Sequence, residues 1–524
     1  MRSLRSLRAL AVLVVVSSGL ATVDAADRPN IVVILADDLG YGDPACYGGK
    51  IPTPHIDRLA SQGMRFLDAH TSSAVCSPTR YGLLTGRYNW RSKLQRGVLG
   101  GLSPRLIEAE RQTIASFLNQ QGYHAAAVGK WHLGLDWSVR PGKQVTELNI
   151  EPREQVFNVD YAKPFQNGPL SVGFDEYFGI SASLDMVPYV FLRNDRVTVP
   201  PTEDREFLMM AGRDKGPKTR QGPTAPGFEA EGVLPEIVRE SCEIIARQAP
   251  KSKESEGGRE PFFLYVPLTG PHTPILPTPE WAGKSGMNPY ADFVMQTDAA
   301  VGAMIGALKE AGVEQDTLVI LTSDNGCSPQ AKFDELKVHG HNPSGPLRGN
   351  KADLFEGGHR VPFVVRWPGR CAAGETSPET ICLTDIFATA AEICGEKLAD
   401  EAAEDSFSFL AALQPGGRTT RDHLVSHSIN GSFAIRRGPW KLLLCPDSGG
   451  WSEPRPGAKK AQGLMGVQLY NLETDLAESR NVADAEPKRV EELREHLDRI
   501  VERGRSTPGR PQKNAVPVDV MARK

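Results

Sequence analysis

The segment CSPTR, from Cys76 to Arg80, combines a thiol, a helix-starting proline and a guanidinium group. Ser77 is a good N-cap and Pro78 a good first helical residue, so we expect a helix to begin immediately after Cys76. That start would place the thiol at the positive end of a helix dipole, where anions are stabilised. Arg80, about one turn further on, could bind the same anion. The pattern predicts a nucleophile beside an oxyanion-binding group; a free cysteine before an ordinary capped helix is the alternative.

Two pairs of oxygen-bearing side chains follow apolar runs. Asp37 and Asp38 come directly after NIVVILA, and Asp324 and Asn325 come directly after TLVILTS. A ligand set with neither thiol nor imidazole suits Ca²⁺ or Mg²⁺ rather than zinc. Either pair alone could mark a simple turn. Two such pairs after two buried strands together predict a metal site.

Two further apolar runs also end in polar residues. AAAVGKWH ends in Lys130 and His132, and FFLYVPLTGPH ends at His272. Continuous runs of this kind are typical of strands buried on both faces, and hence of a mostly parallel sheet. Helical patterns, QTIASFLNQQGYH and DAAVGAMIGALKEAG, precede two of the four runs. We therefore predict an α/β fold whose ligand site lies at the carboxyl ends of the strands.

The N-terminus indicates export. Arg2, Arg5 and Arg8 precede a short apolar run at residues 10–16, and small residues lead to a predicted cleavage site after Ala25. Residues 1–25 therefore read as a signal peptide, which predicts a periplasmic or secreted protein. The run is too short to span a bilayer, and no later run is long enough, so we expect no membrane span in the mature protein. A net charge of -4 gives no indication of nucleic-acid binding.

The remaining sequence predicts two folded units. A catalytic α/β domain is expected over residues 26–400, with surface insertions at 200–227 and 250–261. A smaller C-terminal α+β subdomain, 401–524, would hold antiparallel strands, an amphipathic helix at 486–504 and a tail. The eight cysteines are too sparse for a disulfide scaffold. Cys382 could pair with Cys394 or Cys371.

The segment CSPTRYGLLTGR resembles the signature of the type I sulfatase family, whose cysteine is oxidised to formylglycine. Other segments resemble that family in the same order: ADDLGYGD and SDNG its two metal pairs, GKWHLG and GPHTP its histidine elements, and LRGNKADLFEGGHRVPFVVRWPG its lysine segment. The resemblance runs from about Asn30 to LYNLETDLAESRNV. It is strongest to the arylsulfatase A-like branch.

The resemblance implies a sulfuric ester hydrolase with the alkaline-phosphatase-like sulfatase fold. Its cofactors would be one Ca²⁺ ion and 3-oxoalanine (Cα-formylglycine) at position 76. The implied metal ligands are Asp37, Asp38, Asp324, Asn325 and the modified Cys76. Sulfate esters would be hydrolysed through a covalent sulfo-enzyme intermediate.

The resemblance also implies roles for the basic residues. Arg80 and Lys130 would orient the modified residue, and Lys130 with Lys351 would neutralise the sulfate oxygens. His132 would be the base that releases sulfate. His272 would be the acid for the departing alkoxide, assisted by Lys351.

Ser183, in GISASLD, loosely resembles a sulfate-contacting serine of the arylsulfatase A-like branch. The expected substrates are sulfated glycans or small sulfate esters such as aryl sulfates. The expected protein partner is a formylglycine-generating or anaerobic sulfatase-maturing enzyme.

Two alternatives stay open. One is a metal-dependent phosphatase or phosphodiesterase of the alkaline phosphatase superfamily, which usually uses a Ser or Thr nucleophile and two zinc ions with histidine ligands. The other is a catalytically silent protein that binds sulfated glycans. The oxygen ligand set and Cys76 argue against the first, and the presence of every catalytic residue type argues against the second.

Overall fold

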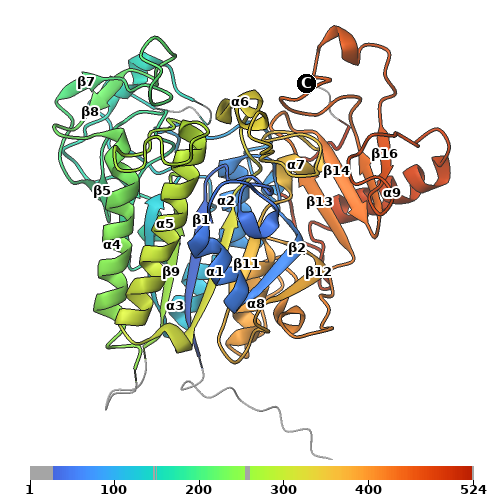
Figure 1. The fold of residues 1–524 in the computed structure, drawn as a ribbon, viewed down its shortest axis with the longest axis horizontal. Helices are drawn as coiled ribbons and strands as arrows, with labels where there is room; N and C mark the ends of the chain where they lie inside the picture. The colour runs from blue at the N-terminus through green and yellow to red at the C-terminus, as the bar shows by residue number, and fades with distance from the viewer. Residues whose placement is uncertain (1–27, 146–147, 149, 254–259, 522–524) are drawn as a thin grey trace, which may run out of the picture.

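The computed structural model describes residues 28–145, 148, 150–253 and 260–521, so the predicted signal peptide lies outside the described residues. Its main feature is a sheet of ten strands within these residues, in the order β12-β2-β11-β10-β1-β9-β3-β4-β5-β6 (Figure 1). The strands are β1 (Asn30–Ala36), β2 (Met64–His70), β3 (His124–Lys130), β4 (Glu176–Ile180), β5 (Leu192–Arg193), β6 (Arg196–Val197), β9 (Phe262–Pro267), β10 (Thr317–Ser323), β11 (Phe363–Arg366) and β12 (Glu375–Cys382).

The centre of this sheet is parallel, as predicted. β1 pairs in parallel with β10 on one side and β9 on the other, and β3 continues the parallel set to β4. β11 is antiparallel to both of its neighbours. The four predicted apolar runs are β10, β1, β9 and β3, which are adjacent strands. Their carboxyl ends therefore lie at one edge, the upper edge in Figure 1.

Helices flank the sheet on both sides. They are α1 (Pro54–Gln62), α2 (Cys76–Thr85), α3 (Ile114–Gln120), α4 (Val233–Gln248), α5 (Pro289–Glu310), α6 (Phe333–Lys337), α7 (Glu356–His359) and α8 (Asp385–Ile393). The helical pattern that starts at Asp298 is only part of α5. The helix begins earlier because the side chain of Asn288 accepts a hydrogen bond from the N–H of Ala291, and Pro289 occupies the first turn.

A second, antiparallel sheet is formed by β13 (His423–His427), β14 (Phe433–Arg437), β15 (Trp440–Leu443) and β16 (Gln468–Asn471). Helix α9 (Pro487–Glu502) packs on it through Leu493, Leu497 and Ile500. This is the predicted arrangement of the C-terminal part, while the boundary at residue 400 stays a prediction. The expected tail is not free: the carbonyl of Lys513 accepts a hydrogen bond from Arg87 at 2.7 Å.

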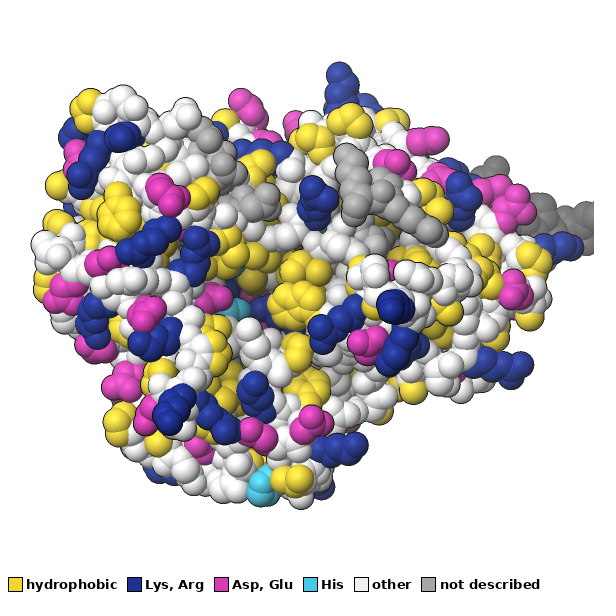
Figure 2. Space-filling view, turned by 90° about the horizontal axis from the view of Figure 1, so that it is seen from above, with side chains coloured by type: hydrophobic (Ala, Val, Ile, Leu, Met, Phe, Trp, Pro, Cys, Tyr) yellow, Lys and Arg dark blue, Asp and Glu magenta, His cyan; other side chains and the backbone are white. Residues whose placement is uncertain are grey.

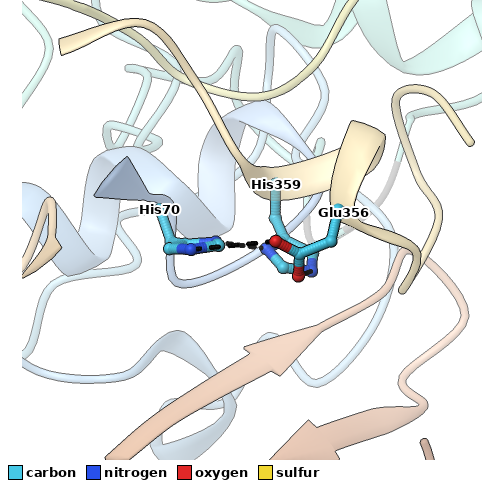
Figure 3. Close-up of side chains that lie close together, drawn as sticks. All are labelled: His70, Glu356 and His359. Atoms are coloured by element: carbon cyan, nitrogen blue, oxygen red, sulfur yellow. Dashed lines mark hydrogen bonds and ion pairs between the residues drawn. The ribbon is translucent and has the colours of Figure 1, made fainter. Parts of the chain in front are cut away.

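The two sheets are joined by a buried polar network, of which Figure 3 shows the side chains of His70, Glu356 and His359. His70 Nδ1 lies 3.0 Å from His359 Nδ1, and its Nε2 lies 2.9 Å from Asp68. Lys441, from the second sheet, places Nζ 3.1 Å from His359 Nε2 and 2.9 Å from Glu356. These contacts occupy the ring nitrogens that a metal ion would need. We therefore interpret the network as a connection between the sheets.

All eight cysteines are free thiols. The suggested pairing of Cys382 with Cys394 or Cys371 is wrong, because Cys382 packs in the hydrophobic cluster of the second sheet and the other two pack in the main core. In the part of the chain that the structure describes, no helix has the length and apolar character needed to cross a membrane.

Candidate active site

Polar side chains gather where the central parallel strands end. Asp37 and Asp38 follow β1, Asp324 follows β10, Lys130 is the last residue of β3, and His272 lies beyond β9. All five are at least nine-tenths buried. Viewed from this edge, the molecule has a hollow with histidine and basic side chains in its floor (Figure 2). Neighbouring parallel strands thus bring together motifs that are far apart in the sequence.

Helix α2 places Cys76 at this edge, with a different cap from the one expected. The helix starts at Cys76 itself, and Val75 is the N-cap. Ser77 is not the cap, because its hydroxyl accepts a hydrogen bond from the N–H of Leu99 at 3.2 Å. Pro78 is tolerated in the first turn because the backbone N–H groups there have no helical partners, so the N–H that proline lacks is not needed. Cys76 remains at the N-terminal end of the helix and is buried.

Arg80 holds acidic side chains rather than facing an open anion site. Its Nε and Nη2 lie 3.1 and 2.7 Å from Oδ2 of Asp324, and Nη2 is 3.4 Å from Asp37. Its Nη1 donates to the carbonyl of Lys130 at 2.9 Å. The anionic oxygens that Arg80 binds are therefore those of the protein's own carboxylates, and not those of an open substrate site. Its contacts suit a residue that positions the metal pair and Lys130.

Two lysines lie among these carboxylates. Lys130 Nζ lies 2.6 Å from Asp37 Oδ2, and Lys351 Nζ lies 2.7 Å from Asp38 Oδ1. Burial acts to raise the pKa of Asp37, but Lys130 and the other nearby cations outweigh it and hold the pKa below its usual range. Burial disfavours the charge of Lys351, yet Asp38 reverses that effect and raises the lysine pKa. The site therefore holds charged carboxylates and ammonium groups in contact.

Three buried oxygens in this cluster have no hydrogen-bond partner among the described residues: Asp37 Oδ1, Asp38 Oδ2 and Asn325 Oδ1. Asn325 donates through Nδ2 to Asp38 Oδ1 at 2.6 Å, which leaves its carbonyl oxygen free. Burial and the charge of Asp37 raise the pKa of Asp324, so a cation here would relieve carboxylate repulsion. Because buried polar atoms are normally paired, these oxygens fit a hard divalent cation.

The contacts of His132 show which of its ring nitrogens carries the proton. His132 Nε2 lies 2.7 Å from the carbonyl of Leu99, which can only accept, so Nε2 carries the proton. Its Nδ1 is buried and has no hydrogen-bond partner within the described part of the chain. Burial, reinforced by Lys130, lowers the pKa of His132 well below its usual value, which keeps the ring neutral. His132 thus has an unshared lone pair in the site.

His272 is hydrogen-bonded through Nδ1, whereas His132 is hydrogen-bonded through Nε2. Its Nδ1 contacts the carbonyl of Thr273 and lies 3.1 Å from Ser183 Oγ, while Nε2 lies 3.8 Å from Asp38 Oδ2. Ser183 also accepts from Lys130 Nζ at 3.2 Å. The structure therefore brings Ser183 into the cluster despite the weak signal around it. The backbone carbonyls of Leu99 and Thr273 were not foreseen, because carbonyl groups leave no mark in a sequence.

Comparison with known proteins shows the family of the chain. Residues 29–396 match the family model described as Sulfatase. The chain is 34% identical to an N-acetylgalactosamine-6-O-sulfatase of Bacteroides thetaiotaomicron, covering 90% of this chain and 93% of that protein. It is 30% identical to arylsulfatase A of Homo sapiens, covering 97% and 95%.

Solved structures show the same architecture. A 6S-sulfatase structure, from work on glycosaminoglycan metabolism by Bacteroides thetaiotaomicron, superposes with a TM-score of 0.75 at 31% identity. It covers 90% of this chain and 99% of its own. A sulfatase from Pseudoalteromonas sp. has a TM-score of 0.65 at 23% identity, covering 90% and 89%, and shares the fold.

Proposed function

Because the chain belongs to the sulfatase family and is a sulfuric ester hydrolase, we propose that it releases sulfate from sulfated glycans, using one calcium ion and a formylglycine made from Cys76. A relative named N-acetylgalactosamine-6-O-sulfatase supports a glycan substrate. Arylsulfatase A among the relatives extends the class to small sulfate esters such as aryl sulfates.

One observation carries the proposal: three unpaired, buried oxygens lie beside two buried lysines, at the edge where Cys76 begins a helix. The residues that would hold the calcium ion are Asp37, Asp38, Asp324, Asn325 and the modified residue 76. When present, the ion and the hydrated aldehyde would supply an acidified hydroxyl as the nucleophile and a second hydroxyl for the release of sulfate.

The lysines are suited to bind the sulfate group. Lys130 and Lys351 each have an ammonium group in contact with a metal-pair carboxylate, so their charges are fixed in place before substrate arrives. Charges that need no reorganisation stabilise negative oxygens most effectively in a buried site. Ser183, bonded to Lys130, adds a hydroxyl to the same wall. Arg80 donates hydrogen bonds to Asp324 and to the carbonyl of Lys130 at the end of β3, and so fixes their relative positions.

The histidines are suited to move protons in opposite directions. His132 has a neutral ring with Nδ1 unprotonated, which is the state that a general base requires. His272 has Nδ1 tied to the carbonyl of Thr273, so a proton for the departing alkoxide would be carried at Nε2. Asp38 Oδ2 lies 3.8 Å from that nitrogen.

The thiol itself is a poor nucleophile. Burial raises the pKa of Cys76, although Lys130 and Lys351 oppose the shift. At neutral pH an unaltered side chain would thus stay protonated. This supports conversion of Cys76 by a formylglycine-generating or anaerobic sulfatase-maturing enzyme. We also propose export to the periplasm or the medium, on the basis of the predicted signal peptide alone.

The test combines mass spectrometry with sulfate release. Protein from a host able to mature sulfatases should carry an aldehyde on the tryptic peptide that contains residue 76. It should release sulfate from some members of a panel of 4-sulfo and 6-sulfo sugars and aryl sulfates, and Cys76→Ala should not. Matured protein that is inactive on every sulfate ester would favour a glycan-binding role, and preferential cleavage of phosphate esters would favour a phosphatase.

A further inference from the structure

The insertion at 200–227, which the sequence leaves without a function, is fastened beside the proposed acid. It contains β7 (Glu203–Arg205) and β8 (Gly222–Thr224), which pair with each other. Ile275, three residues beyond His272, donates to the carbonyl of Met209 at 2.8 Å and accepts from the N–H of Ala211 at 3.0 Å. Backbone hydrogen bonds thus fix the insertion to the segment that carries His272.

A cavity of about 300 Å³ lies where the insertion meets two catalytic segments. Met209, Met210 and Arg213 line it from the insertion. Thr273 lines it from the segment of His272, and the segment that follows Asp324 and Asn325 lines it with Lys332 and Glu335. In Figure 1, β7, β8 and α6 lie along the same upper edge as the active site. The volume matches the lower range of pockets that bind small molecules.

Thr273 connects this cavity to the proposed acid. The hydroxyl of Thr273 lies 3.4 Å from His272 Nδ1, and Thr273 also lines the cavity. The cavity therefore adjoins the segment that carries His272, and neither sulfate-binding lysine contributes to its lining. A substrate that continues beyond its sulfated sugar would then place the next sugar here.

The lining of the cavity indicates the chemistry of that sugar. Met209 and Met210 offer flexible apolar surface for the C–H face of a ring. Two lining cations, Arg213 and Lys332, face a single lining anion, Glu335, which pairs with Arg213. The excess positive charge favours an anionic group.

We propose that this cavity is a subsite for an acidic sugar next to the sulfated one, so that the preferred substrate is an acidic oligosaccharide. The anionic group could be a carboxylate or a second sulfate. This inference rests on the proposed sulfatase function, and it assigns the insertion a part in substrate choice.

The test compares substrates that share one sulfate ester: an aryl sulfate, a disaccharide with a neutral neighbouring sugar, one with a uronate and one with a sulfated neighbour. Arg213→Ala and Lys332→Ala should each lower kcat/KM for the acidic disaccharides up to about fivefold, the range of exposed ion pairs. Neither should change the aryl sulfate rate. The uronate and disulfated substrates show which anion the subsite prefers.

The variant Glu335→Gln separates binding from loop structure. It breaks the same ion pair as Arg213→Ala, so a purely structural role predicts losses in both variants. The proposal predicts a gain for Glu335→Gln on the acidic disaccharides, and a preference that weakens with added salt. Lys218→Ala, in the same insertion but paired with Glu206, is the matched control.

Equal losses of kcat/KM in Arg213→Ala and Glu335→Gln would overturn the inference while leaving the sulfatase function intact. Losses of kcat/KM on the neutral disaccharide as well would have the same consequence. Failure to cleave any sulfate ester would instead count against the proposed function.

Discussion

Replacing the carboxyl group of Glu478 would test the network that joins the two sheets. Its Oε1 lies 2.9 Å from Lys441 Nζ, and its Oε2 accepts from the N–H of Glu356 at 2.6 Å. Lys441 also lies 2.9 Å from the carboxylate of Glu356, so two acids share one ammonium group. Burial raises the pKa of Glu478 to about 7, because Lys441 offsets only part of the effect and the charge of Glu356 adds to it.

The sign of the pH effect follows from this shift. An acid with a higher pKa in the folded state than in the unfolded state stabilises the fold at low pH, and this contribution is lost as pH rises. The ordinary value is 4.5, so the loss falls between about pH 4.5 and pH 7. The difference corresponds to roughly 3 kcal/mol in the free energy of unfolding. Glu478→Gln cannot ionise, so the loss should disappear.

The assay is urea unfolding of both proteins at pH 5 and pH 8. Relative to the parent protein, Glu478→Gln should gain roughly 2–3 kcal/mol between the two pH values, because a small part of the loss has already occurred at pH 5. Any cost of the substitution that does not depend on pH cancels in this comparison. Glu473→Gln, which removes an exposed acid nearby, should show no such gain. If the unfolding free energies of parent and Glu478→Gln change in parallel with pH, the reasoning about this network is refuted.

Three further outcomes concern the active site. Cys76→Ala should abolish sulfate release and leave the circular dichroism spectrum unchanged, and residual turnover in this variant would contradict the role of residue 76. His132→Gln should lower kcat by about 100-fold or more, the usual contribution of a general base, without altering bound calcium measured by atomic emission; a loss of only a fewfold would contradict that role. Chelation should lower Tm, and calcium at about 100 times its Kd should restore about 2.7 kcal/mol of stability. Asp37→Asn should weaken that response, and a parent protein that does not respond would contradict the metal site.

The sequence is sufficient to predict the central sheet and the grouping of its motifs. β1, β3, β9 and β10 are continuous apolar runs, which mark strands covered on both faces. Parallel strands that neighbour one another end at one edge, so residues following them must meet. That rule alone groups Asp37, Lys130, His272 and Asp324.

Other features depend on tertiary contacts that have no local pattern. The start of α5 at Pro289 is set by a side-chain cap, and Ser77 is diverted from the expected cap by the N–H of Leu99. Arg80 was expected to bind a substrate anion, but its donors bind Asp324, which follows β10, and the carbonyl of Lys130 in β3. Such partners lie far away in the chain, and therefore spacing alone cannot reveal them.

The second sheet is hydrogen-bonded to segments that form the proposed active site. The N–H of Ala74, two residues before the thiol, donates to the carbonyl of His427 at 2.9 Å. The N–H of Ala352, next to Lys351, donates to the carbonyl of Ala74 at 2.8 Å, and the carbonyl of Ala352 accepts from the N–H of Ile429 at 3.2 Å. The backbone that carries the nucleophile and the backbone that carries the lysine are thus bonded to each other and to the connection between β13 and β14. Because catalysis depends on fixed distances between such groups, a change in how the second sheet docks would alter the active site itself.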